Sequence, residues 1–213
     1  MTRLPILMYH NISNIEQVSS GLTISVQKLE RQLCHLAESG FTTFHLSELE
    51  NLTAIPQQSI VITFDDVTDN QFLYAVPLLE KYNLKATFFI PFGYIGKTDL
   101  WNEGKETIMT MQKLQSLGTW IELGLHSYAH KKYETLTETQ INEDFEKCFK
   151  IIEENDLKVY KAVAYPYGNF PKKEPKKTLF KSVLEQNNIK MGLRIGNKIN
   201  KFPFKNPFEI MRI

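Results

Sequence analysis

Two adjacent carboxylates end an apolar stretch of this sequence. Residues 59–64 have the composition of a buried strand, and Asp65 and Asp66 follow them directly. Neighbouring carboxylates repel each other unless a cation or a proton gives them different roles. One can hold a metal ion while the other acts as a general base. Capping of the helix expected at 70–82, together with simple solvation, would also explain the pair.

A pair of histidines follows a second apolar stretch, at 121–125. His126 and His130 are four residues apart, a spacing that brings two imidazoles to one side of a helical turn, where a single metal ion can bridge them. Taken alone, the pair would also fit a surface loop. The metalloprotease pattern HExxH needs a glutamate where this chain has Ser127, so peptide hydrolysis of that type is not indicated.

Together, these two features form a candidate catalytic metal site. Two histidines and one aspartate supply three protein ligands and leave the fourth zinc position to water, which is the arrangement of catalytic zinc and not of structural zinc. Zinc-bound water ionises near neutral pH, and the second aspartate could deprotonate it.

The elements that must position these residues alternate between strand and helix. Apolar runs predict strands at 6–9, 42–44, 60–64, 86–90, 121–125, 162–164 and 191–195. Ser25 and Gly40 are suited to begin and end a helix at 26–37, and Thr137 with Gln140 forms a capping-box signature before another. About seven strands, most followed by a helix, predict an α/β fold with a closed or partly closed parallel barrel. An open doubly wound sheet is the alternative.

Composition excludes several classes of function. The 213 residues contain 25 lysines and arginines against 24 acidic residues, so no overall positive field attracts nucleic acid or an anionic membrane. No window approaches the length of a membrane-spanning helix. We therefore expect one domain over 1–213. The amino-terminal apolar run is too short for a cleavable signal, so a cytoplasmic location is the default expectation, with an extracellular one if the chain has been trimmed.

The two cysteines and two of the histidines have no evident role in the site. Cys34 and Cys148 lie in helical patterns without CxxC spacing, which predicts reduced, packed thiols. His35 and His45 belong to no motif and are expected at the surface or in packing. Two aromatic residues, Trp101 and Tyr128, could stack on a sugar face, although aromatic residues near metal sites more often pack.

Three motifs in order resemble those of a known family. Residues 63–66 (TFDD), followed by 78–82 (LLEKY) and 85–90 (KATFFI), resemble the polysaccharide deacetylases, also called carbohydrate esterase family four or NodB-homology domains. Residues 126–130 (HSYAH) and 165–168 (YPYG) match two further motifs of that family. The resemblance spans roughly residues 4–213. It implies a distorted (β/α) barrel of about seven parallel strands, of the glycoside hydrolase/deacetylase-like kind.

The resemblance also implies an activity and a cofactor. The expected enzyme is a hydrolase of carbon–nitrogen bonds other than peptide bonds, an N-deacetylase that releases acetate from an N-acetylated amino sugar. By this resemblance Asp65 is the base, and Asp66, His126 and His130 hold one divalent ion. Zinc is the expected ion, with cobalt, nickel or iron as alternatives. A backbone N–H at Tyr167, next to Pro166, would help to stabilise the oxyanion.

The opening of the chain resembles a permuted branch of the family, the exopolysaccharide poly-N-acetylglucosamine deacetylases. Residues 8–11 (MYHN) match its first strand, and residues 207–213 match its last. Since no histidine follows His130, this resemblance assigns His10 as the acid that protonates the leaving amine. Histidine is the side chain whose unperturbed pKa suits that role near neutral pH.

The chain departs from the family pattern at two further positions. Val67 replaces the usual glycine after the aspartate pair, and a β-branched residue does not readily adopt a positive φ, so we expect an altered turn and reduced activity. Ala164 replaces the arginine that often precedes the third motif. Arg212 or Arg194 would then have to orient Asp65.

Two other functions remain open at this point. One is deformylation or deacylation of a different amide, such as that of a lipid-linked sugar, because the same chemistry acts on either acyl group. The other is a saccharide-binding protein with impaired catalysis, which the changes at Val67 and Ala164 motivate. The expected partner is an N-acetylated saccharide substrate, and nucleic acid is not expected as a partner. The sequence makes no prediction of the sugar or of the oligomeric state.

Overall fold

The structure is a computed structural model that describes residues 1–15, 19 and 21–213. Its strands are β1 (Thr2–Leu4), β2 (Ile6–Tyr9), β3 (Asn11–Ser13), β4 (Thr23–Ser25), β5 (Thr42–Thr43), β6 (Ser59–Asp65), β7 (Ala86–Ile90), β8 (Ile121–Leu125), β9 (Val159–Ala164), β10 (Met191–Ile195), β11 (Asn200–Phe202) and β12 (Ile210–Arg212). Its α-helices are α1 (Val26–Glu38), α2 (Leu46–Leu49), α3 (Val76–Lys81), α4 (Met111–Gln115), α5 (Glu138–Glu154) and α6 (Lys176–Gln186). Shorter turns are the π-helical η1 (Gln71–Ala75) and the 3-10 helices η2 (Phe92–Tyr94), η3 (Leu100–Asn102), η4 (Tyr133–Thr135) and η5 (Pro166–Gly168).

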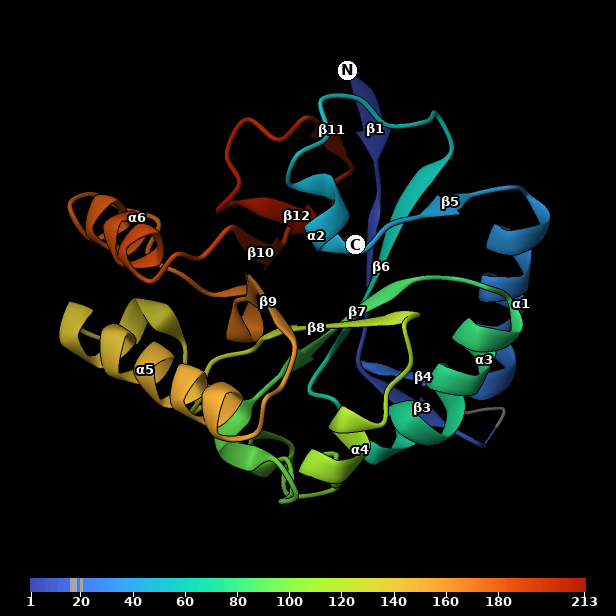
Figure 1. The fold of residues 1–213 in the computed structure, drawn as a ribbon, viewed down its shortest axis with the longest axis horizontal. Helices are drawn as coiled ribbons and strands as arrows, with labels where there is room; N and C mark the ends of the chain where they lie inside the picture. The colour runs from blue at the N-terminus through green and yellow to red at the C-terminus, as the bar shows by residue number, and fades with distance from the viewer. Residues whose placement is uncertain (16–18, 20) are drawn as a thin grey trace.

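Seven parallel strands form a nearly closed barrel, in the order β12, β10, β9, β8, β7, β6, β2. The first and last strands meet through Ile213. Its carbonyl accepts from the N–H of Met8 at 2.8 Å, and its own N–H donates to the carbonyl of Ile6 at 2.9 Å. Helices α5 and α6 lie on one side of the barrel, and α1 and α3 on the other (Figure 1). The predicted fold class is confirmed, and the open sheet is excluded.

One predicted barrel strand has a different place. The strand expected at 42–44 is β5, which pairs with Ser59 and Ile60 at the start of β6 and lies off the barrel path. With two residues, β5 is too short to run along the barrel wall. The seventh position belongs to β12, from the segment that resembled a C-terminal strand. Strands β2, β7, β8 and β10 have the predicted bounds.

Strand β6 shows how the barrel separates two apolar clusters. Ile62 and Phe64 pack in the outer cluster with helix residues such as Leu33. Val61 belongs to the inner cluster, because successive side chains of a strand point to opposite faces. The same alternation turns Asp65, four residues after Val61, toward the barrel interior.

The predicted helix signals act as expected. The hydroxyl of Ser25 accepts from the N–H of Lys28 at the start of α1, and Gly40 has a φ of +73° just after its end. Thr137 and Gln140 form the capping box of α5. Within the described residues, none of the helices combines the length and apolar character needed to cross a lipid bilayer. Cys34 and Cys148 are free thiols, as predicted.

Candidate active site

The chemistry-bearing residues meet at the carboxyl ends of the barrel strands. Asp65 ends β6 and Asp66 follows it, while His10 follows β2 and His126 follows β8. Parallel strands place these ends at the same mouth of the barrel. Asp65, Asp66, His126 and His130 are all buried. The sequence-predicted residues therefore come together in one water-poor site.

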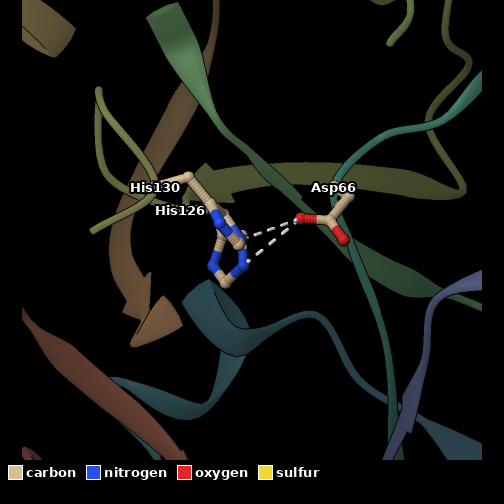
Figure 2. Close-up of side chains that lie close together, drawn as sticks. All are labelled: Asp66, His126 and His130. Atoms are coloured by element: carbon tan, nitrogen blue, oxygen red, sulfur yellow. Dashed lines mark ion pairs between the residues drawn. The ribbon is translucent and has the colours of Figure 1, made fainter. Parts of the chain in front are cut away.

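Asp66, His126 and His130 converge on one point. Oδ1 of Asp66 lies 3.5 Å from Nε2 of His126 and 3.3 Å from Nε2 of His130. Figure 2 shows the Asp66 carboxylate facing both imidazole rings. One ligand atom from each residue lies within 4.8 Å of the others. Oδ1 of Asp66 is buried and has no hydrogen-bond partner among the described residues. A buried carboxylate oxygen that faces two imidazole nitrogens fits a divalent cation of the zinc type.

The surroundings of His126 suit a metal ligand. Nδ1 lies 2.8 Å from the carbonyl oxygen of Ala164, and because a carbonyl only accepts, Nδ1 carries the hydrogen. Nε2 then presents its lone pair toward Asp66. Burial lowers the pKa of His126 to about 4, despite the opposing charge of Asp65. The ring is therefore neutral near pH 7, as metal binding requires.

The histidines converge through a loop and not through the predicted helical turn. Ser127 and His130 have φ values of 63° and 50°, which no α-helical residue adopts. The loop amides bond to side chains instead of to carbonyls four residues earlier. The hydroxyl of Ser127 accepts from the N–H of His130 at 2.8 Å, and the carboxylate of Asp144 accepts from the N–H groups of Tyr128 and Ala129 at 2.8 and 3.1 Å.

Arg212 holds Asp65 by both carboxylate oxygens. Nη1 donates to Oδ1 at 2.6 Å and Nη2 to Oδ2 at 2.7 Å, with the whole pair buried. Burial by itself would raise the pKa of Asp65, but the charge and hydrogen bonds of Arg212, together with the neighbouring His126 and His10, outweigh it and hold this pKa well below its usual range. Asp65 is therefore ionised at any pH near neutrality.

The alternative arginine, Arg194, does not reach Asp65. Its Nη1 donates to the carbonyl of Ile195 at 3.2 Å. Leu193 points into the barrel core, so the next residue along β10 points outward. The prediction that Arg194 orients Asp65 is therefore wrong. Arg212 instead points into the barrel, on the same side of β12 as Ile210 two residues earlier.

His10 lies beside the Asp65 carboxylate. Its Nε2 is 3.5 Å from Oδ2 of Asp65. The side-chain amide of Gln71, which is fully buried, donates to the carbonyls of both His10 and Asp65, at 2.9 and 2.6 Å. Gln71 thus ties together the two strand ends that carry these residues. Sequence reasoning missed it, and the signal was a polar residue in an otherwise apolar helix start.

The third motif forms a tight turn beside the histidines. Pro166 is buried, whereas Tyr167 is 49% exposed and has a φ of 60°; the Tyr167 ring centroid is 5.0 Å from that of His130. Inside the turn, Gly168 donates to the carbonyl of Tyr165 and Asn169 to that of Pro166. The N–H of Tyr167 is not used by either of these bonds. This N–H therefore takes no part in the two hydrogen bonds that form the turn.

Val67 keeps the backbone shape that a glycine would take. Asp66 and Val67 have φ values of 78° and 45°, both in the left-handed region. The Val67 side chain is fully buried in the outer core, and its carbonyl accepts from the N–H of Met109 at 2.8 Å. The expectation of an altered turn is wrong, because packing and this hydrogen bond hold the residue in a conformation that it would otherwise avoid.

The remaining candidates are placed as follows. Trp101 packs on the imidazole of His130, with ring centroids 3.8 Å apart. His45 precedes α2, and its Nε2 contacts the carbonyl of Trp120; His35 is exposed on α1. Asp144 was missed by sequence reasoning, although it lies in the buried stripe of α5 with Ile141 and Phe145. A carboxylate in such a stripe requires a buried partner.

Comparison with known proteins identifies the family of the chain. Residues 53–185 match the family model described as polysaccharide deacetylase. A poly-beta-1,6-N-acetyl-D-glucosamine N-deacetylase of Staphylococcus aureus is 30% identical over 121 residues, which are 53% of this chain and 41% of that protein. A putative polysaccharide deacetylase of Bacillus subtilis, YxkH, is 27% identical over 172 residues, 79% of this chain and 58% of that protein. The matches therefore span only part of these curated relatives.

Solved structures share the fold over the whole chain. The deacetylase PplD of Streptococcus pyogenes, in complex with acetate, has a TM-score of 0.80 at 21% identity, covering 100% of this chain and 92% of that one. IcaB from Ammonifex degensii has a TM-score of 0.82 at 22% identity, covering 100% and 91%. The family match covers more than half of the sequence, and the chain belongs to the polysaccharide deacetylase family.

Proposed function

We propose that this chain is a metal-dependent N-deacetylase that hydrolyses the acetamide of an N-acetylated amino sugar and releases acetate. The observation that carries this proposal is the convergence of Asp66, His126 and His130 beside an ionised Asp65. The relative from Staphylococcus aureus, named for deacetylation of poly-beta-1,6-N-acetyl-D-glucosamine, supports the substrate class.

Asp66, His126 and His130 would hold the ion. A divalent metal such as zinc, when bound, would polarise the acetyl carbonyl and acidify a water molecule. The Ala164 carbonyl keeps the Nε2 lone pair of His126 directed at the site, and burial keeps that ring neutral. Asp66, whose pKa, despite burial, is lowered by the histidines beside it, and His126 therefore need no protonation change near pH 7 to bind the ion.

Asp65 would act as the general base. Arg212 fixes both oxygens of this carboxylate and helps to lower its pKa, so the group is ionised near neutral pH and is held in place. The same pairing makes Asp65 a weak base. It can accept a proton efficiently only from a water molecule whose own pKa has been lowered, which is why the base and the three metal ligands must act together.

His10 would protonate the departing amine. Its Nε2 lies on the Asp65 side of the site, and Gln71 holds the backbone of both residues. The N–H of Tyr167 would donate to the developing oxyanion. In this scheme water adds to the acetyl carbon, the carbon–nitrogen bond breaks, and the products are acetate and a free amino sugar.

Two departures had suggested a binding protein with impaired catalysis. Val67 retains the left-handed turn, and Arg212 supplies the guanidinium that Ala164 lacks. Both observations support an enzyme. Deformylation, or deacylation of a lipid-linked sugar, would use the same residues, and the test below includes an N-formyl substrate for that reason.

The decisive measurement is acetate release from N-acetylglucosamine oligomers and formate release from their N-formyl counterparts, with and without a chelator, together with metal analysis of the purified protein. Asp65→Asn should keep the metal and lose turnover, whereas His126→Ala should lose both. His35→Ala, which changes an exposed histidine outside the site, is the control. Near-normal turnover in Asp65→Asn would refute the assignment of the base, and faster release of formate than of acetate would favour the deformylase.

A further inference from the structure

The two histidines of the site are held in different ways. Nδ1 of His126 has the carbonyl of Ala164 as its partner. Nδ1 of His130 is buried and has no hydrogen-bond partner in the described part of the chain. A metal-binding histidine usually donates its second ring N–H to an acceptor that fixes the ring plane. Something other than a hydrogen bond must fix the plane of His130.

An indole ring covers the imidazole of His130. The centroids of the Trp101 and His130 rings are 3.8 Å apart, and their planes differ by 19°, so the two rings are stacked. Tyr94 meets Trp101 edge to face at 4.9 Å, and Tyr167 meets His130 at 5.0 Å with planes 66° apart. His130 is therefore in contact with aromatic rings at both its face and its edge, which restricts rotation about its side-chain bonds.

The loop that carries Trp101 is itself well anchored. Trp101 lies in η3, and Asp99, two residues earlier, is 1% exposed. The carboxylate of Asp99 accepts from the N–H of Glu106 at 2.9 Å and from the side-chain amide of Asn102 at 2.8 Å. The loop thus has an internal polar centre that sets the position of Trp101.

The same loop is bonded to the segment that follows Asp66. The N–H of Met109 donates to the carbonyl of Val67 at 2.8 Å, and the N–H of Asp69 donates to the carbonyl of Thr107 at 2.7 Å. The position of Trp101 is therefore coupled through backbone hydrogen bonds to the loop of the aspartate ligand. Trp101 in turn contacts the second histidine.

We propose that Trp101 is a positioning residue of the metal site: its stacked indole fixes the ring plane of His130, in place of the missing hydrogen bond, and directs Nε2 toward Oδ1 of Asp66. This inference rests on the proposed function, because it concerns the metal ion that the three ligands would hold. It assigns Trp101 to the protein's own site, and not to stacking on a sugar.

The test is the zinc affinity of metal-free protein, measured by competition with a chromophoric chelator. Loss of outer contacts to a ligand typically weakens metal binding by about 10- to 100-fold, so Trp101→Leu should bind zinc at least about tenfold more weakly than the unchanged protein. Trp101→Phe keeps an aromatic face and should recover most of the affinity. Trp120→Phe is the matched control, since Trp120 precedes β8 at the end of the strand opposite His126.

A spectroscopic measurement tests the stack with Trp101 in place. The chain has two tryptophans, so Trp101 is the sole source of tryptophan emission in Trp120→Phe. One equivalent of Co²⁺ should quench its fluorescence strongly, whereas the remaining Trp120 in Trp101→Phe should respond weakly. This arm remains informative even if Trp101→Leu fails to fold, which melting of the metal-free proteins will reveal.

The outcomes separate this inference from the proposed function. Zinc affinity unchanged in Trp101→Leu, or Trp101 emission unchanged by Co²⁺ in a protein that binds it, would overturn the role of Trp101 and leave the metal site standing. Failure of the unchanged protein to bind zinc or cobalt would overturn the metal-dependent function, and the role of Trp101 with it.

Discussion

The guanidinium of Arg212 and the carboxylate of Asp65 form a buried, two-pronged ion pair, with N–O distances of 2.6 and 2.7 Å. The pair joins β12 to the end of β6 across the barrel interior. It places a fixed positive charge behind the proposed base, and Nη1 of Arg212 also donates to the hydroxyl of Thr63 at 3.3 Å. The barrel thereby orients Asp65 without the arginine that the family usually has where this chain has Ala164.

Replacement of Arg212 by lysine should separate orientation from charge. Lysine keeps the positive charge but lacks the planar fork that binds both carboxylate oxygens. We expect turnover to fall by at least about tenfold, roughly the effect of losing one well-placed hydrogen bond in the transition state, while metal content stays unchanged. Acetate release and metal analysis on the same protein samples measure both quantities.

Arg194→Lys is the control for this variant, because Arg194 lies on the outer face of β10 and contacts the carbonyl of Ile195. It should behave like the unchanged protein. If Arg212→Lys also retained full turnover, the two-pronged geometry would have no part in orienting Asp65, and charge alone would suffice.

The buried His126 predicts a pH dependence of stability in the metal-free protein. Burial lowers its pKa from 6.5 to about 4, so between these values the unfolded chain binds a proton that the folded chain does not. The free energy of unfolding should therefore fall as pH falls from about 6.5 to about 4, by roughly 3 kcal/mol, and His126 should add nothing further below that range. Urea unfolding at several pH values, with chelator present, measures this slope.

His126→Gln removes the titrating ring and should flatten the slope. Asp65 contributes little inside this window, since its stabilising effect is lost only as pH falls below its ordinary value of 3.8. Equal slopes in the two proteins would show that another group, and not His126, takes up the proton on unfolding.

Sequence patterns were sufficient to predict the barrel and the convergence of Asp66, His126 and His130, because both depend on local signals. The apolar run before Asp65 and the one before His126 end at the same side of any parallel sheet, so their convergence followed from topology. The loop shape of 126–130 did not follow, since it depends on Asp144 from a helix that lies later in the sequence. The choice between Arg212 and Arg194 depended on strand register and barrel closure, which no local pattern encodes.

The left-handed backbone at Val67 predicts that replacement by glycine destabilises the protein less than replacement by alanine. Val67→Ala removes two buried methyl groups and leaves a side chain at a φ of 45°, whereas Val67→Gly removes one further buried carbon but also relieves the left-handed strain. We expect both variants to be less stable than the unchanged protein, with the glycine variant more stable than the alanine variant by about 1 kcal/mol. Chemical denaturation of the two proteins gives the comparison. Alanine equal to or better than glycine would show that the turn is unstrained.

Asp144 should control the affinity of the site for its ion without touching it. Its carboxylate accepts the N–H groups of Tyr128 and Ala129, so Asp144→Asn sets an amide N–H₂ against one of these donors and leaves that donor unpaired. We expect a loss of about 1–3 kcal/mol in the free energy of unfolding and roughly tenfold weaker zinc binding, as His130 loses its fixed position. Denaturation and chelator competition measure the two effects, and Glu143→Gln, one residue away on the exposed side of α5, serves as the control.

Saturating zinc should restore part of the stability that Asp144→Asn loses, because the ion binds only the ordered loop. Weaker folding with unchanged zinc affinity would instead make Asp144 a purely structural anchor.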